Sequence, residues 1–197
     1  MHISRPEGNE AGFGLIELLI AMVVLNVGLL AIVAAFGSGA VAINRAGKIA
    51  TAGALADAQM EQYRLLTYDA IGLDTGAALD ATYTTDAACP GNASPCSNTA
   101  PGGSNSCSAG STLRTNFPTV CVPIRTVNSG TTPAAPDRHS YRVDTYIRTI
   151  ASTANQRATK IVTIVVRDGT KLNGRALARE ASTFDCSTGQ IPGAAPC

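Results

Sequence analysis

Residues 12–36 decide the fold of this 197-residue chain, and they read GFGLIELLIAMVVLNVGLLAIVAAF. From Phe13 to Phe36 the run has 24 residues, almost all of them apolar. At about 1.5 Å per residue, a helix of this length crosses the roughly 30 Å hydrocarbon core of a bilayer. Only Glu17 and Asn26 interrupt it. A carboxylate inside such a segment costs at least about 2.5 kcal/mol unless it is neutralised, so Glu17 is predicted to have a function.

Residues 1–12 are a short polar segment, MHISRPEGNEAG, that ends in small residues. A Sec signal peptide would place its apolar stretch before the small residues, whereas here the order is reversed. Gly12-Phe13 followed by Glu17 at the head of a long apolar helix resembles the class III signal of type IV prepilins and pseudopilins. The resemblance implies that a prepilin peptidase cuts between Gly12 and Phe13 and that the new amine of Phe13 is N-methylated. It also implies an assembly role for Phe13 and Glu17, in which Glu17 neutralises the Phe13 amine of a neighbouring subunit.

The charges that flank the run do not fix its orientation in a membrane. The leader carries one cation, Arg5, and two acids, Glu7 and Glu10, whereas Arg45 and Lys48 follow the run. The positive-inside rule therefore gives no answer by itself. The prepilin resemblance implies a cytoplasmic leader and a C-terminal domain outside the cytoplasmic membrane.

From Ala40 the pattern becomes amphipathic. Apolar residues recur at spacings of three and four, which places them on one helical face: Ile49, Ala52, Ala56, Met60, Tyr63 and Leu66. No proline or polar linker intervenes, so one helix is predicted from about Phe13 to about residues 66–70, before the first stop signal at Gly72. Residues 13–39 would be its apolar half for lipid or a helix bundle, and residues 40–71 the half that packs on a soluble domain. A membrane anchor followed by a separate helix is the alternative.

Residues 72–118 are rich in Cys, Gly and Ser, and their lack of apolar periodicity predicts a long loop. An even number of cysteines beyond a membrane segment indicates disulfides in an oxidising compartment. The candidates are Cys89, Cys96, Cys107, Cys121, Cys186 and Cys197. Fifteen pairings are possible, including local ones such as Cys107 with Cys121 and Cys186 with Cys197, and the sequence does not choose. Their spacing matches no zinc pattern, so no metal site is predicted.

Residues 119–197 change to the alternation that is typical of β-strands. Strands are predicted at about residues 119–125, 141–148, 159–167 and 176–184, followed by a disulfide-stapled tail. Pro123 suggests that the first strand is short or at an edge, and the third strand is apolar on both faces, which suits a central position. Short connections with turn signals such as Asp168-Gly169 favour an antiparallel meander.

A helix and a sheet with one apolar face each must bury one another. The predicted fold class is therefore α+β and pilin-like, with the long N-terminal helix packed on a C-terminal antiparallel β-sheet.

No constellation in the sequence is typical of an enzyme or a cofactor site. Asp137, His139 and Ser140 have the residue types of a catalytic triad, but they lie within four residues of one loop. Four aromatic and basic residues share the second predicted strand, and they are interpreted as a solvated strand face rather than a nucleic-acid surface: Tyr141, Arg142, Tyr146 and Arg148.

Charge is unevenly distributed although the net charge is only +1. Residues 50–113 hold six acids and one base, whereas residues 114–179 hold eleven bases and three acids. Opposite patches could form head-to-tail contacts between subunits, with Arg142 and Arg148 on the basic surface. Intramolecular pairing of the same charges is the alternative.

These features predict a structural subunit without catalytic activity, a minor pilin of a type IV pilus or a related filament. A type II secretion pseudopilin or a major pilin is the first alternative, and a membrane-anchored adhesin or binding module that uses residues 72–118 is the second. The expected partners are other pilin or pseudopilin subunits, the prepilin peptidase, the inner-membrane assembly platform and, before assembly, membrane lipid. No nucleic-acid partner is expected.

Overall fold

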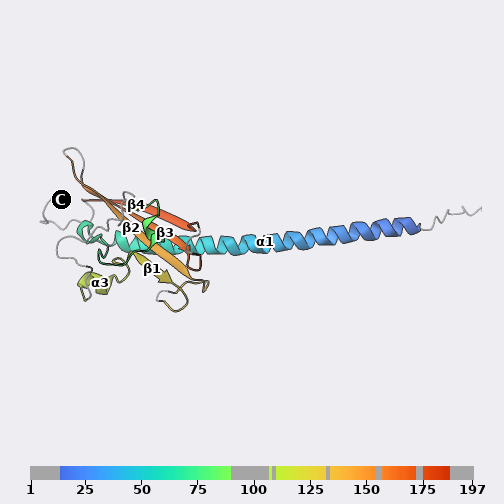
Figure 1. Cartoon of the computed structure of the whole chain (residues 1–197), viewed down its shortest axis with the longest axis horizontal. Helices are drawn as coiled ribbons and strands as arrows, with labels where there is room; N and C mark the ends of the chain where they lie inside the picture. Colours follow the sequence, from blue (N-terminus) through green and yellow to red (C-terminus); the bar gives the residue numbers. More distant parts are fainter. Residues whose placement is uncertain are drawn as a thin grey trace, which may run out of the picture. The chain divides into compact units, whose positions relative to one another are not determined.

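The structure is a computed structural model, and it describes residues 14–89, 107, 110–131, 134–153, 157–171 and 175–186. The chain divides into two compact units, Met1–Arg45 and Ala46–Cys197. Figure 1 shows the elements in chain order, with the first helix followed by a four-stranded sheet. The predicted α+β arrangement is confirmed.

The long helix α1 runs from Leu15 to Arg64, 50 residues without a break. It starts where the backbone N–H of Glu17 donates to the carbonyl of Gly14. Within the second unit, four residues of the predicted apolar stripe are at most 2% exposed: Ala52, Ala56, Met60 and Tyr63. Ile49 remains 43% exposed, so the buried stripe begins one turn later than the periodicity predicts.

The sheet contains β1 (Ile124–Val127), β2 (Tyr141–Ile150), β3 (Thr159–Asp168) and β4 (Ala178–Asp185), in the order β1-β2-β3-β4. Every neighbouring pair is antiparallel, so the predicted meander is confirmed. The apolar strand β3 is central, and β1, which follows Pro123, is a four-residue edge strand, as predicted.

The predicted first strand starts too early. Residues 118–121 form a turn rather than a strand, and Val120 and Cys121 are fully buried in it. The hydroxyl of Tyr63 on α1 donates to the carbonyl of Val120 over 2.6 Å. The alternation around Val120 therefore reflects burial against the helix, and strand pairing begins only at Ile124.

The main core lies between the second half of α1 and one face of the sheet. Tyr141, Val143 and Ile147 of β2 belong to the same buried cluster as Ala52, Met60 and Tyr63, together with alternate residues of β3. The odd-numbered residues of β2 therefore face the helix, in keeping with the two-residue period of a strand.

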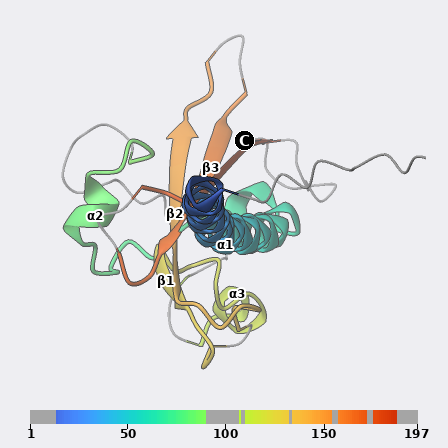
Figure 2. The same cartoon turned by 90° about the vertical axis from the view of Figure 1, so that its right-hand side faces the viewer.

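The opposite face of the sheet is covered by residues 79–89, which include the short helix α2 (Ala81–Thr84). The ring of Tyr83 stacks on that of Tyr146, with centroids 4.3 Å apart. Figure 2 shows α1 and α2 on opposite sides of β2 and β3. The prediction of a solvated strand face is therefore wrong, because Arg142 and Tyr146 are buried under this segment and only Arg148 is exposed.

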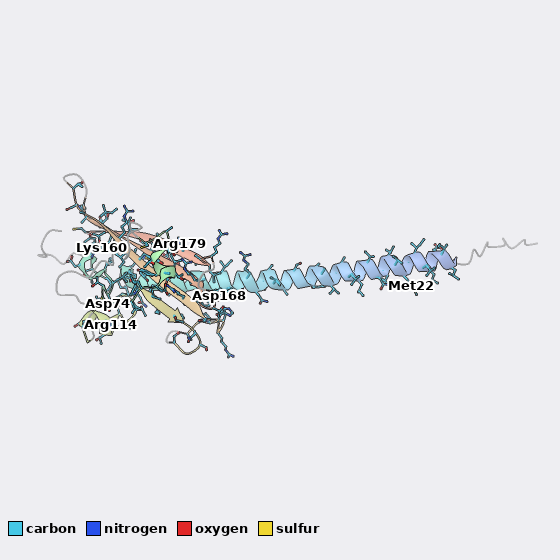
Figure 3. The ribbon with its side chains drawn as sticks, viewed as in Figure 1. Met22, Asp74, Arg114, Lys160, Asp168 and Arg179 are labelled. Carbon is cyan, nitrogen blue, oxygen red and sulfur yellow. A yellow bond between two sulfur atoms is a disulfide. The ribbon has the colours of Figure 1, made fainter. Side chains whose placement is uncertain are left out.

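A second covering segment contains α3 (Thr112–Asn116) and follows Cys107. The Ser111 hydroxyl caps the helix by accepting a bond from the backbone N–H of Arg114. The guanidinium of Arg114 donates to the carbonyl of Cys107 over 2.8 Å and lies 3.5 Å from the carboxylate of Asp74. Figure 3 labels Asp74 and Arg114 close together. These contacts hold parts of residues 72–118 on the domain.

Candidate functional site

The first half of α1 carries apolar side chains that no other described residue covers. Seventeen large apolar side chains between Leu15 and Ile43 are each 53–80% exposed. Met22, labelled in Figure 3, is one of them. Removing this many side chains from water is worth on the order of 20 kcal/mol, more than the stability of a typical domain. Lipid or other apolar helices must therefore cover this surface.

The helix has the length that a membrane requires. α1 is long and apolar enough to cross a bilayer, and it lies near the N-terminus. The exposed part of α1 continues past Phe36, and from Leu15 to Ile43 it has 29 residues with Glu17 as its only charge. In a helix these rise about 43 Å, which matches a bilayer of about 40–45 Å including its headgroups.

Glu17 lies in the first turn of α1 and is exposed. Within the described part of the chain it forms no ion pair. The positive end of the helix dipole favours an acid at this position, but that effect is small compared with the cost of a charge in lipid. Gly12 and Phe13, the residues of the predicted cleavage and methylation site, lie outside the described residues.

The family model described as the prokaryotic N-terminal methylation motif matches residues 8–33. The chain carries the type IV prepilin signal. The match covers Gly12, Phe13 and Glu17, so the predicted resemblance is confirmed over these residues. Comparison with the curated proteins and with the solved structures found no match.

The prepilin signal supports a type IV pilin-like or pseudopilin subunit, which is a structural subunit rather than an enzyme. It implies processing by a prepilin peptidase and assembly with other pilin subunits. The apolar helix and the motif together fit membrane anchoring.

Four of the candidate cysteines are described, and all four are oxidised. Cys107 and Cys121 form a disulfide with their Cα atoms 5.5 Å apart. Cys89 and Cys186 are also disulfide-bonded, to partners that lie outside the described residues. Cys96 and Cys197 themselves are not among the described residues.

The residues of triad type do not form a triad. One carboxylate oxygen of Asp137 accepts the backbone N–H of His139, and the other accepts the hydroxyl of Tyr141 over 2.5 Å. The imidazole of His139 points instead to Asp168, 3.8 Å away. Ser140 contributes its carbonyl to the backbone N–H of Gly169. These contacts shape a loop and leave no aligned nucleophile and base.

Intramolecular pairing accounts for most of the uneven charge. Of the six acids in residues 50–113, four form ion pairs with bases of the same chain: Glu61, Asp74, Asp80 and Asp86. The side chain of Arg142 is only 4% exposed, and it donates to Asp80 over 2.5 and 2.8 Å and to Asp144 over 2.7 Å. Arg142 therefore cannot belong to a contact surface between subunits, whereas Arg148 stays exposed.

Sequence reasoning missed a group of exposed cations at one end of the sheet. Arg138 precedes β2, and Lys171 and Arg175 lie between β3 and β4. In an antiparallel meander the start of the second strand and the turn after the third lie at the same end. The order of the predicted strands could therefore have brought these residues together.

Proposed function

We propose that the chain is a minor pilin, a structural subunit of a type IV pilus or a related filament. In this proposal a prepilin peptidase cuts between Gly12 and Phe13, the amine of Phe13 is methylated, and the subunit assembles through α1. The observation that carries the proposal is the position of Glu17. It is the one acid between Leu15 and Ile43, the exposed apolar part of α1, and it lies inside the methylation motif.

The chemistry of assembly follows from the cost of burying a charge. Cleavage after Gly12 creates a new amine at Phe13, four residues before Glu17. In an apolar bundle a carboxylate must be protonated or paired with a cation. The amine of a neighbouring subunit supplies that cation. Because a charge pair forms at one axial offset only, it sets the register between adjacent helices.

Before assembly the apolar half of α1 spans the cytoplasmic membrane once, with the leader inside and the Ala46–Cys197 unit outside. The inner-membrane assembly platform then moves the subunit into an extracellular or periplasmic filament. The exposed side chains between Leu15 and Ile43 support both stages, because lipid and a helix bundle are each apolar environments.

The test is mass spectrometry of the N-terminus in filaments sheared from cells. We expect a chain that begins with N-methylated Phe13. A chain in that fraction that still begins at Met1 would overturn the proposal.

The minor role is tested by quantification of the same fraction. A minor pilin should be far less abundant than the main subunit. If this chain is the most abundant subunit, it is a major pilin. If it is processed but appears only in a periplasmic filament of a secretion system, it is a pseudopilin.

A further inference from the structure

Four cations gather at the end of the sheet where α1 enters the Ala46–Cys197 unit. They are Lys48 on α1, Arg138 before β2, and Lys171 and Arg175 between β3 and β4. We call this group the basic end. Figure 3 shows Asp168 at this end of β3 and Lys160 at the opposite end.

Direct contacts join the segments that carry the basic end. The amine of Lys48 lies 3.4 Å from the carboxylate of Asp168. The backbone N–H of Gly169 donates to the carbonyl of Ser140 over 2.8 Å, and that of Lys171 donates to Asp168. A side chain at Gly169 would place its Cβ 2.9 Å from the backbone of Ser140, so this close approach requires glycine. The loop before β2 and the turn after β3 therefore form one structure with Lys48.

The cations of the basic end are largely free to bind a ligand. Arg138, Lys171 and Arg175 are exposed, and among the described residues none of them forms an ion pair. Two acids lie beside them. Asp168 pairs with Lys48, and Asp137 accepts bonds from Tyr141 and His139. Four cations against two engaged acids leave the basic end positive.

The chain itself brings this positive surface close to a membrane. Ile43 is the last exposed large apolar residue before the first cation of α1, and Lys48 follows it by five residues. Five residues span at most about 18 Å when fully extended and about 7.5 Å in a helix. Whatever the arrangement of the two units, Lys48 stays within this distance of the headgroups that surround the end of the span.

We propose that the basic end binds anionic phospholipid headgroups while the subunit is anchored in the membrane. The inference rests on the membrane stage of the proposed function. Lipid is favoured over nucleic acid because single-stranded nucleic acid is bound by stacking on several exposed aromatic rings. Of the two rings described beside Asp168, that of Tyr141 is fully buried and only the His139 imidazole is partly exposed. Electrostatic attraction between clustered cations and an anionic leaflet is effective within about one Debye length, which the short connection provides. The contact holds the domain against the bilayer and must break when the subunit enters the filament.

The test measures which lipids the full chain retains. The chain is incorporated into bilayers of equal parts phosphatidylglycerol and phosphatidylcholine, extracted in mild detergent, and its bound lipids are counted by native mass spectrometry. We expect phosphatidylglycerol to be enriched over phosphatidylcholine. Each surface cation is worth about a fivefold change in binding, so the triple variant R138Q/K171Q/R175Q should lower the enrichment at least about fivefold.

A matched variant controls for the general loss of positive charge. R148Q/R157Q removes two exposed cations at the opposite end of the sheet and keeps the same apolar helix, so its enrichment should equal that of the unaltered chain. Equal enrichment in all three proteins would overturn the inference, even where filament incorporation is normal. A triple variant that loses binding of a 20-nucleotide DNA but keeps its lipid enrichment would also overturn it, in favour of a nucleic-acid surface.

Discussion

Glu17 is the only charged residue between Gly14 and Ile43, and the proposed assembly role gives this charge a purpose that a plain membrane anchor would not. An anchor gains nothing from a carboxylate, because a charge in lipid is costly. In a bundle of helices that each begin with a free amine, the carboxylate of one helix can pair with the amine of its neighbour. Such a pair fixes the register between the two helices.

The first prediction concerns this carboxylate. Glu17→Ala should leave peptidase cleavage and membrane insertion unchanged, because neither needs an acid at the fifth position of the mature chain. Filament incorporation should fall at least about tenfold, which corresponds to a loss of roughly 1.4 kcal/mol. The measurement is the ratio of this chain in the sheared filament fraction to that in the membrane fraction.

Asn26→Ala is the matched control, since it removes the other polar side chain between Phe13 and Phe36. It should assemble normally. Normal incorporation of the Glu17→Ala variant would show that the acid has no role in assembly.

The second prediction contrasts two arginines on the same face of β2. Arg142 is buried and bonded to Asp80 and to the fully buried Asp144, whereas Arg148 is exposed. Burial raises the pKa of the Asp144 carboxyl, and Arg142 opposes that rise. Arg142→Met leaves the buried carboxylate of Asp144 without its main partner. The free energy of unfolding should therefore fall by about 3–5 kcal/mol.

Thermal and denaturant unfolding of the full chain in detergent measures this difference. Arg148→Met should change the free energy of unfolding by no more than about 0.5 kcal/mol. Equal effects of the two substitutions would mean that residues 79–89 do not cover β2 in solution.

At the scale of elements, periodicity predicted the helix α1 and the strands β2, β3 and β4 because each forms its own repeating pattern. The covering segment 79–89 could not be predicted in this way. Its attachment depends on single contacts between distant residues, such as the pair of Asp80 with Arg142 and the stacking of Tyr83 on Tyr146. A strand face that carries Arg, Asp and Tyr has the same pattern whether water or a polar segment covers it.

The third prediction tests how this segment is attached. Asp80 caps α2 by accepting a hydrogen bond from the backbone N–H of Tyr83. Its two carboxylate oxygens also accept hydrogen bonds from the two terminal nitrogens of Arg142. The bond from Arg142 lowers the pKa of the Asp80 carboxyl below its ordinary value. Its folded-state pKa therefore lies below the unfolded one, so the pair stabilises the fold above about pH 4 and this contribution is lost as pH falls further.

Asp80→Asn should lower the free energy of unfolding by about 1–2 kcal/mol at pH 7, a modest value because the carboxylate is half exposed to water. The difference between the two proteins should shrink below pH 4. Denaturant unfolding at pH 7, 4 and 3 measures it, and a difference that stays constant with pH would show that the charge of Asp80 contributes nothing.

For the whole molecule, the proposed assembly residues form a local sequence pattern, whereas the basic end follows only from the strand order and from the contact of Lys48 with Asp168. Gly12, Phe13 and Glu17 form a local pattern within six residues, so no tertiary information is needed. Lys48, Arg138 and Lys171 are distant in sequence and meet only because the loop before β2 and the turn after β3 pack together. Counting charges along the chain shows that cations are in excess after residue 114. It does not show where these cations lie in the fold.

The fourth prediction follows from the division into two units. The main core is built from residues 52–186, and none of the exposed apolar side chains up to Ile43 contributes to it. A chain that begins at Ala46 should therefore fold without detergent, elute as a monomer, and unfold cooperatively within about 3 °C of the full chain, a change that corresponds to roughly 1 kcal/mol. Size-exclusion chromatography and circular dichroism measure this.

The Tyr63→Ala variant of the same shortened chain shows that the measurement can detect damage, because Tyr63 is fully buried and bonded to Val120. Its free energy of unfolding should fall by about 3–5 kcal/mol, as is typical when a large aromatic side chain in a core is replaced by alanine. The prediction is wrong if the shortened chain itself aggregates or melts without a cooperative transition. In that case the apolar half of α1 is needed for folding of the Ala46–Cys197 unit as well as for the proposed assembly.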